Sequence, residues 1–287
     1  MTEKIFLYTD NMQKGLFAYY WGVIHALSNI ENGDKLYVNL CKKTPYYDPK
    51  YITTDNVWEY YFEQPFSNYD LENAITVDFD YFCPIVDNFK FGLDGNGKYS
   101  LSHSSVSSEE NFKIAKKLSK KYLKFKPHII QKVNEFEEYY MKGYNILGVQ
   151  YRGGECFHTA HARNQFHLMS IDYHISKINE NLKTNNYDKI FLITNDQEAR
   201  DILMDYYGDL MIKYDCDLLC PPGVHLDTAW LHNDRNYEKG EFAVIDCILL
   251  SKCAKILATS SNLTSLSIVL SGSETETEFI DTHITYF

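Results

Sequence analysis

The feature that most constrains the fold is an alternation of apolar runs and helical patterns that begins near residue 144. Residues 144–150 form a buried-type run ending in polar loop residues, and residues 172–182 then carry apolar side chains at helical spacing. A strand at 189–194 and a helix at 197–207 repeat the pattern. It continues with a strand at 210–214, a helix at 242–252, a strand at 255–259, a helix at 263–270 and a strand at 278–280. Such alternation predicts β-α-β units around a parallel sheet.

The first half opens in the same way and then becomes less regular. A strand at 5–8, a helix at 15–29 and a strand at 35–40 form a β-α-β opening, while residues 41–108 show no clear periodicity. Helices are predicted from about 108 to 125 and from Pro127 to about 141. A length of 287 residues suits two domains. We therefore predict an α/β protein with two Rossmann-like domains, an N-terminal one at 1–143 and a C-terminal one at 144–287.

Composition excludes several classes of function. The chain has 28 Lys and Arg against 39 Asp and Glu, a net charge of −11, which argues against a broad nucleic-acid surface. Seven dispersed cysteines indicate free thiols in a reducing compartment. The start has no apolar leader, and no apolar run is long enough to span a membrane. We expect a soluble, cytoplasmic protein.

Two compositional biases leave alternatives open. Tyrosine-rich surfaces suit sugars, and the chain has 24 Tyr against 3 Trp, but drift in an AT-rich genome gives the same bias. Seven lysines lie within residues 113–126. They are typical of a solvated helix face, or of a basic edge near an anionic lipid-linked acceptor or a membrane surface.

Polar residues follow three of the predicted strands in the second half, at 150–155, 194–196 and 259–262. In open α/β sheets, ligands bind outside the carboxyl ends of the strands. Arg152 is one of only four arginines, and Gly153 and Gly154 after it allow close approach of a ligand. Its guanidinium suits a phosphate, or equally an ion pair with a carboxylate such as Glu155.

Two other positions suit a nucleotide. Ser260, Ser261 and Asn262 open a predicted helix, where hydroxyls and backbone N–H groups either cap the helix or bind an anion. Asp246 lies within an apolar helical segment, where a carboxylate is costly unless it is hydrogen-bonded. It matches the two adjacent donors of guanine, or it is satisfied by backbone or tyrosine hydroxyl groups.

Histidines after Arg152 raise the question of a metal. His158, His161 and His167 include an H-x-x-H spacing, but no Cys or Glu completes a convincing ligand set, so we expect no metal. Glu155, His158 and His161 are the candidates for a general base.

With these motifs in order, the second half resembles the α1,6-fucosyltransferase and nodulation fucosyltransferase group of the GDP-fucose-dependent superfamily. The matching segments are Gly148–Glu155 with Phe166-His167, Phe191–Asp196, Leu231–Asn233, and Val244–Ser251 followed by Thr259–Asn262. The resemblance covers residues 144–287. The first half matches only through its β-α-β opening.

The resemblance implies a metal-independent, inverting GT-B glycosyltransferase without a cofactor, using GDP-fucose as co-substrate and a glycan or glycolipid as acceptor. It implies that Arg152 binds the β-phosphate and that Asp246 contacts guanine. Glu155 and His158 join Arg152 as candidate catalytic residues. The implied donor-binding residues are Gln150, Gly153, Gly154, Asn195, Asp196, His232, Asn233, Asp246, Ser260, Ser261 and Asn262.

The motif also departs from the family pattern, because Gln150 stands where the family has a histidine and Gly153 where the best-known members have a second arginine. Two rival functions therefore stay open. One keeps the fold with another GDP- or UDP-linked sugar such as UDP-xylose, and the other is a glycan- or nucleotide-binding protein without turnover. No nucleic-acid partner is expected, and peripheral membrane contact is an alternative for the lysine-rich helix.

Overall fold

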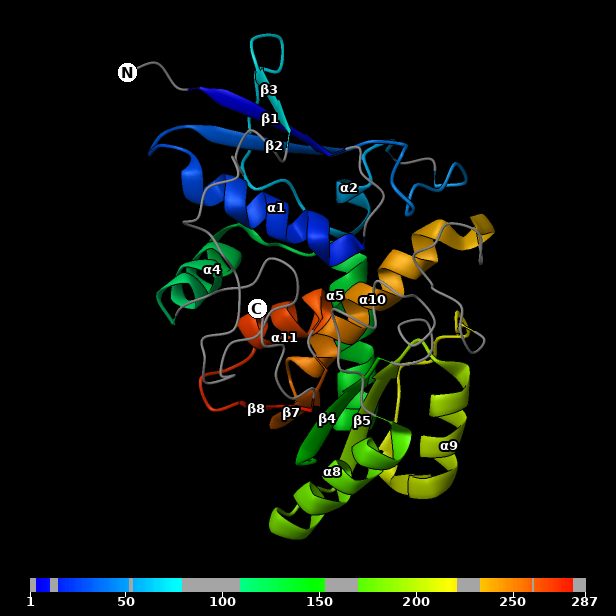
Figure 1. The fold of residues 1–287 in the computed structure, drawn as a ribbon. Helices are drawn as coiled ribbons and strands as arrows, with labels where there is room; N and C mark the ends of the chain where they lie inside the picture. Colours follow the sequence, from blue (N-terminus) through cyan, green and yellow to red (C-terminus); the bar gives the residue numbers. More distant parts are fainter. Residues whose placement is uncertain are drawn as a thin grey trace, which may run out of the picture. The chain divides into compact units, whose positions relative to one another are not determined.

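The computed structural model describes residues 4–10, 15–51, 54–78, 109–152, 170–220, 233–259 and 261–280. Figure 1 labels most of the helices and strands in these segments. The described residues form two compact units. One holds the residues up to 131 together with 233–244, and the other holds those from 132 to 220 and from 245 onward. The domain boundary placed at residue 143 stays a prediction.

The first unit contains a three-stranded parallel sheet. Its strands β1 (Ile5–Asp10), β2 (Lys35–Leu40) and β3 (Ile75–Asp78) lie in the order β2-β1-β3. Helix α1 (Leu16–Asn29) links β1 to β2 and is buried over most of its surface, as a helix that is apolar nearly all round must be. The predicted β-α-β opening is therefore present.

Two elements of this unit lie in the stretch where no periodicity was found. They are the short helix α2 (Trp58–Tyr61) and strand β3. Helix α4 (Glu109–Tyr122) ends before the predicted position at 125, because Phe125 forms an isolated bridge with Phe62.

The helix predicted from Pro127 to about 141 changes type along its length. An α-helix, α5 (Pro127–Phe136), is followed by one π-helical turn, η1 (Glu137–Met141). The N–H of Lys142 donates to the carbonyl of Glu137 at 2.8 Å, which is the wide hydrogen bond of such a turn.

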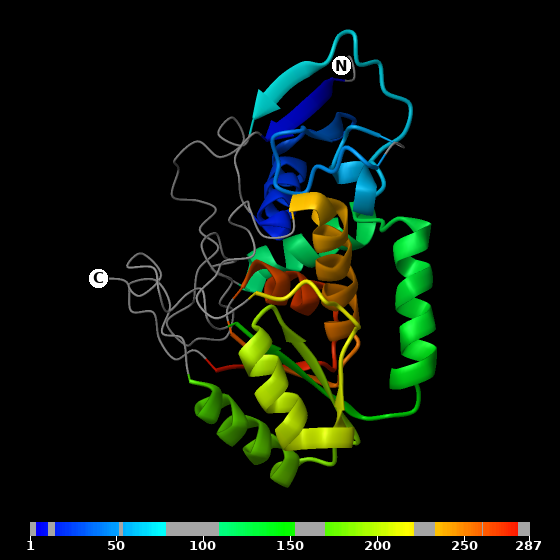
Figure 2. The ribbon, with the colours of Figure 1, turned by 90° about the vertical axis from the view of Figure 1, so that its right-hand side faces the viewer.

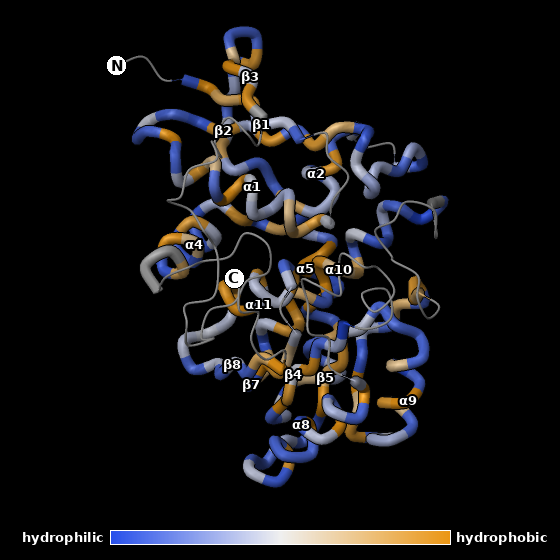
Figure 3. The backbone as a smooth tube through the Cα atoms, in the orientation of Figure 1, coloured by the Kyte–Doolittle hydropathy of each residue, from blue (hydrophilic) through white to orange (hydrophobic). Residues whose placement is uncertain are grey.

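The second unit is built on a five-stranded parallel sheet in the order β6-β5-β4-β7-β8. Strand β4 at its centre is buried at every position, so the continuous apolar run predicted a fully covered strand correctly. In Figure 3 the central strands are largely coloured as hydrophobic. The strands are β4 (Ile146–Tyr151), β5 (Lys189–Thr194), β6 (Met211–Ile212), β7 (Lys255–Ala258) and β8 (Glu276–Phe279).

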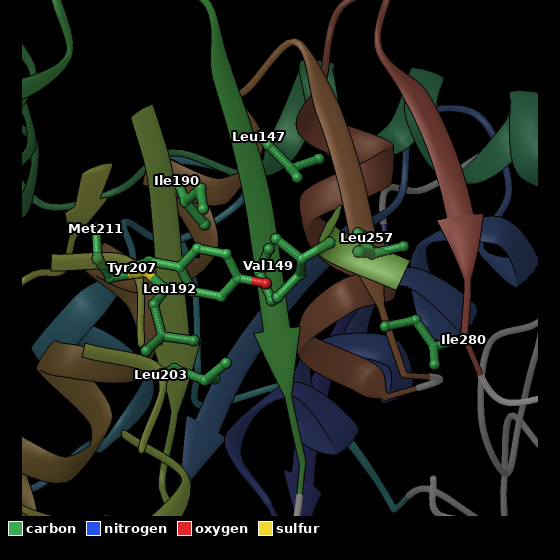
Figure 4. Packing of buried hydrophobic residues seen from close by; sticks show 10 residues of the cluster. Leu147, Val149, Ile190, Leu192, Leu203, Tyr207, Met211, Leu257 and Ile280 are labelled. Atoms are coloured by element: carbon green, nitrogen blue, oxygen red, sulfur yellow. The ribbon is translucent and has the colours of Figure 1, made fainter. Parts of the chain in front are cut away.

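Helices cover both faces of this sheet. Helices α8 (Ile171–Thr184) and α9 (Gln197–Tyr207) pack on one face and lie in front of the strands in Figure 2. The core on that face joins Val149 and Leu192 of the sheet to Ile178, Leu203 and Tyr207 of the two helices (Figure 4). The opposite face carries α10 (Asn236–Leu250) and α11 (Asn262–Leu270).

Helix α10 begins at Asn236, earlier than the start predicted at residue 242. Gly240 weakens the helical pattern there, and packing explains its presence. A Cβ atom on Gly240 would lie 2.3 Å from the ring of Tyr61, so only glycine allows this close approach within the first unit.

Candidate functional site

The strand order of the second unit defines where a ligand is expected. The chain runs from β4 to β5 and β6 on one side, then returns to place β7 on the other side of β4. The direction of winding therefore reverses next to β4. In doubly wound sheets, the carboxyl ends of the strands at such a reversal form the ligand crevice. Here β4 ends in Gln150 and Tyr151, and Thr259 directly follows β7.

Gln150 is the best-defined polar residue at this edge. It is 6% exposed, and its Oε1 accepts a hydrogen bond from the Thr259 hydroxyl at 2.7 Å. The Thr264 hydroxyl of α11 lies 3.4 Å from the same oxygen and donates to the Thr259 carbonyl at 3.0 Å. These contacts fix the amide so that Oε1 is the accepting end. Its Nε2 donates to no residue in the described part of the chain, and the proposal below assigns these two N–H donors to the ligand.

The amino end of α11 lies in the same network. Ser261 caps the helix, its hydroxyl accepting from the Thr264 N–H at 3.1 Å. The hydroxyls of Ser261 and Thr264 are 2.9 Å apart, and Ser265 donates to the Ser261 carbonyl at 2.7 Å. The hydroxyl groups are thus held in place by one another. Capping is one of the two roles expected for Ser261, and anion binding by Ser261 and Asn262 stays a prediction.

The next strand end is occupied by a helix cap. Asp196 is buried, and its Oδ1 accepts from the Ala199 N–H at 2.9 Å at the start of α9. The Asp196 N–H donates to Thr194 at 3.0 Å, and Cys220 donates to the Asn195 carbonyl at 2.7 Å. This geometry gives Asp196 a structural role, and donor binding by Asn195 and Asp196 stays a prediction.

Tyr151 and His174 form a second buried pair, on the opposite face of β4. Their rings meet edge to face with centroids 4.6 Å apart. Burial, and then the charges of Asp196 and Glu198, raise the pKa of Tyr151 to about 12. Burial lowers the pKa of His174, whose Nδ1 contacts the Ser170 carbonyl at 3.1 Å. Its Nε2 has no partner among the described residues.

Asp246 stands apart from these groups on α10. Burial raises the pKa of its carboxyl to about 8, while the positive charge of Lys213 opposes this shift. No described residue donates a hydrogen bond to it, and no described contact joins it to the Gln150 network. Among the described residues, the backbone or tyrosine partner that was one of the two alternatives for Asp246 is therefore not found, and guanine binding stays a prediction.

The structure describes only part of the predicted site. Arg152 follows β4 directly and is half-buried. Asn233 opens a 3₁₀ turn, η3 (Asn233–Arg235), and its side chain is not described. Eight residues singled out in the sequence lie outside the described part of the chain: Gly153, Gly154, Glu155, His158, His161, His167, His232 and Ser260.

Sequence reasoning missed Thr264 and His174. Thr264 contacts Gln150 across 114 positions of the chain, which no local pattern signals. His174 occupies one position of an ordinary amphipathic helix.

Three further predictions from the sequence concern metal ligands, membrane-spanning helices and free thiols. No group of three or more His, Cys, Asp or Glu side chains that could hold a metal occurs among them. None of the helices described is both long enough and apolar enough to cross a bilayer. Free thiols are found at Cys41, Cys216, Cys220, Cys247 and Cys253.

Solved structures with the same fold are glycosyltransferases. NodZ fucosyltransferase from Bradyrhizobium matches with a TM-score of 0.56 and 15% identity, over 94% of both chains. NodZ alpha-1,6-fucosyltransferase soaked with GDP-fucose gives 0.57 and 16%, over 94% of this chain and 93% of that one. POFUT1 in complex with GDP gives 0.54 and 10%, over 96% of this chain and 98% of that one.

These matches confirm the predicted fold class, the α/β GT-B fold with two Rossmann-like domains. The matched proteins named above are GDP-fucose-dependent fucosyltransferases, the group that the sequence motifs resemble. No family model matches the sequence, and neither does any curated protein.

Proposed function

We propose that this chain is a glycosyltransferase that takes a sugar from a nucleotide donor, GDP-fucose, and inverts its anomeric carbon on transfer to a glycan. The observation that carries the proposal is the fixed, buried polar network of Gln150, Thr259 and Thr264 at the winding reversal of the second sheet. The fold supports it, because structures that share this fold were obtained with GDP-fucose and with GDP.

In the proposed reaction, the acceptor hydroxyl oxygen forms a bond to the anomeric carbon as the bond from that carbon to the β-phosphate oxygen breaks. GDP leaves with the electron pair, and a base takes the hydroxyl proton. Arg152 and the Gln150 amide would stabilise the negative charge growing on the diphosphate. The first turn of α11 adds backbone N–H groups aimed at the same charge. Glu155 and His158 are the candidate bases.

The proposed donor specificity rests on Asp246. Burial raises the pKa of this carboxyl to about 8, and the ring N–H and exocyclic amine of guanine would favour its ionised form by donating to both oxygens. Adenine does not present these two donors together. The proposal includes no metal and no cofactor, as in the resembled group; Arg152 and backbone N–H donors would stabilise the charge of the diphosphate instead.

A nucleotide panel and a donor-hydrolysis assay test the proposal. GDP should raise the melting temperature, whereas UDP and ADP should not. GDP-fucose should be turned over when a glycan acceptor is supplied. We expect Arg152→Ala to reduce kcat/KM by about 10²–10³-fold while the protein stays folded, as for the loss of one transition-state donor.

Lys183→Ala is the matched control, since it also removes one positive charge but lies exposed in the last turn of α8. It should leave turnover unchanged. Stabilisation by UDP alone would assign a different donor. Stabilisation by GDP with no turnover of any GDP-sugar would assign binding without catalysis. Gly153 favours that rival, because it stands where the best-known members of the resembled group have a second arginine.

A further inference from the structure

Helix α4 presents a concentrated positive charge on a chain that is strongly acidic. Seven of the lysines lie within residues 113–126, and residues 111–126 contain no Asp or Glu, although the whole chain carries a net charge of −11. Five of these lysines are exposed, and we call them the lysine face: Lys113, Lys117, Lys120, Lys121 and Lys124.

The opposite side of α4 is used for packing within the first unit. Ala115 and Ser119 are buried, and the Ser119 hydroxyl is hydrogen-bonded to the hydroxyl of Tyr20 on α1. Tyr122 packs against Phe66 with ring centroids 4.9 Å apart. The helix is therefore anchored by its apolar side, and its lysine face points outward.

Within the lysine face, Lys121 contacts its neighbour Tyr122, with Nζ 4.6 Å from the centre of the ring. Lys126, outside this set, forms an ion pair with Glu63 at 3.2 Å. By contrast, no carboxylate in the described segments lies within ion-pair distance of Lys117, Lys120 or Lys124. Like charges three and four positions apart destabilise a helix. This repulsion opposes the favourable interaction of Lys120 and Lys121 with the dipole at the end of α4, and a role outside the fold would explain so many like charges on one face.

We propose that the lysine face docks this protein on an anionic lipid surface. Lysines are flexible point charges without the fixed fork of arginine, and α4 contains no arginine. Such groups suit a diffuse negative surface better than a defined phosphate or carboxylate. Ile114, 36% exposed, lies beside them and adds an apolar contact. The acidic remainder of the chain is repelled by the same surface, which orients the protein with α4 toward the lipid.

Sedimentation with vesicles tests this proposal without any nucleotide, so its result is independent of the proposed function. The protein should bind vesicles of phosphatidylcholine with phosphatidylglycerol, should not bind phosphatidylcholine alone, and should be released by salt. Each lysine near an anionic leaflet contributes roughly fivefold to partitioning. The variant Lys117→Gln/Lys120→Gln/Lys121→Gln/Lys124→Gln should therefore bind about 600-fold more weakly.

The control variant Lys43→Gln/Lys50→Gln/Lys142→Gln/Lys183→Gln removes the same charge from four exposed lysines elsewhere. It should bind vesicles as the unmodified protein does. Equal losses in the two variants, or no loss in the α4 variant, would overturn the proposal. Tighter binding to dextran sulfate or DNA than to vesicles would also overturn it, by assigning a soluble polyanion. Glutamine is a good helix former, and circular dichroism of both variants checks that they fold.

Discussion

Asp246 shows how one residue can oppose stability in a place that suits a ligand. Its pKa is raised from 3.8 to about 8 by burial, so the folded state holds the proton more tightly than the unfolded state does. The free energy of unfolding therefore has its full contribution from protonated Asp246 below about pH 4. This contribution is lost progressively as the pH rises to about 8, because folding must then either take up a proton or bury a charge.

This predicts that Asp246→Asn stabilises the protein, and more so at higher pH. The pKa difference sets an upper bound of about 6 kcal/mol on the cost at pH 8, and partial exposure of the residue lowers it. We expect a gain of about 2 kcal/mol at pH 8 and a smaller one at pH 5, measured by urea unfolding at both values. Asp205→Asn, an exposed carboxylate on α9, should show neither gain. A gain for Asp246→Asn that does not change with pH would contradict the burial of this charge.

At the scale of elements, the approach of the end of α10 to β4 depends on one glycine. A Cβ atom on Gly148 would lie 2.6 Å from the Cδ1 of Leu250 and 3.0 Å from the Cβ and Sγ of Cys253. Leu250 and Cys253 are almost completely buried, so neither side chain has free space into which to move. The small residue in the central strand is therefore what allows the helix end to lie this close to the sheet.

We expect Gly148→Ala to lower the free energy of unfolding by about 1–3 kcal/mol through overpacking. Leu250→Ala alone should cost about 2–5 kcal/mol by leaving a cavity. The double variant should cost less than the sum of the two, because each change relieves the other, and a double-mutant cycle in urea measures this coupling. In Gly272→Ala the nearest atom is 3.9 Å away, so this control should be nearly neutral. Additive losses would show that the two positions do not compete for space.

For the whole molecule, the sequence predicted the second unit more closely than the first. Buried parallel strands such as β4 and β5 are continuous apolar runs, and their limits fall within a residue or two of those expected. Strand β3 was missed because it has four residues, is partly exposed at Ile75, and is placed by pairing with β1 rather than by a local pattern. The short helix α2 likewise has too few residues to show a period.

The same reasoning applies to the candidate site. Strand ends are local features, so Gln150 and Arg152 could be predicted from the segment around them. The partners that orient Gln150 come from β7 and α11, more than a hundred residues later, and only the fold brings Thr259 and Thr264 to it. The helix-capping role of Asp196 likewise became visible only with the start of α9.

Apart from Asn233, the described residues proposed to bind the donor belong to the second unit, which leads to a prediction about the whole molecule. GDP at a hundred times its Kd stabilises the state that binds it by about 2.7 kcal/mol. Amide hydrogen exchange should therefore slow by up to about a hundredfold at the ends of β4 and β7 and in the first turn of α11. Strands β1 and β2 of the first unit open through their own local unfolding, and their exchange should not change. Arg152→Ala with GDP should lose the protection. Equal protection of β1 and β2 would show instead that the two units unfold together, or that the nucleotide is bound by residues of both.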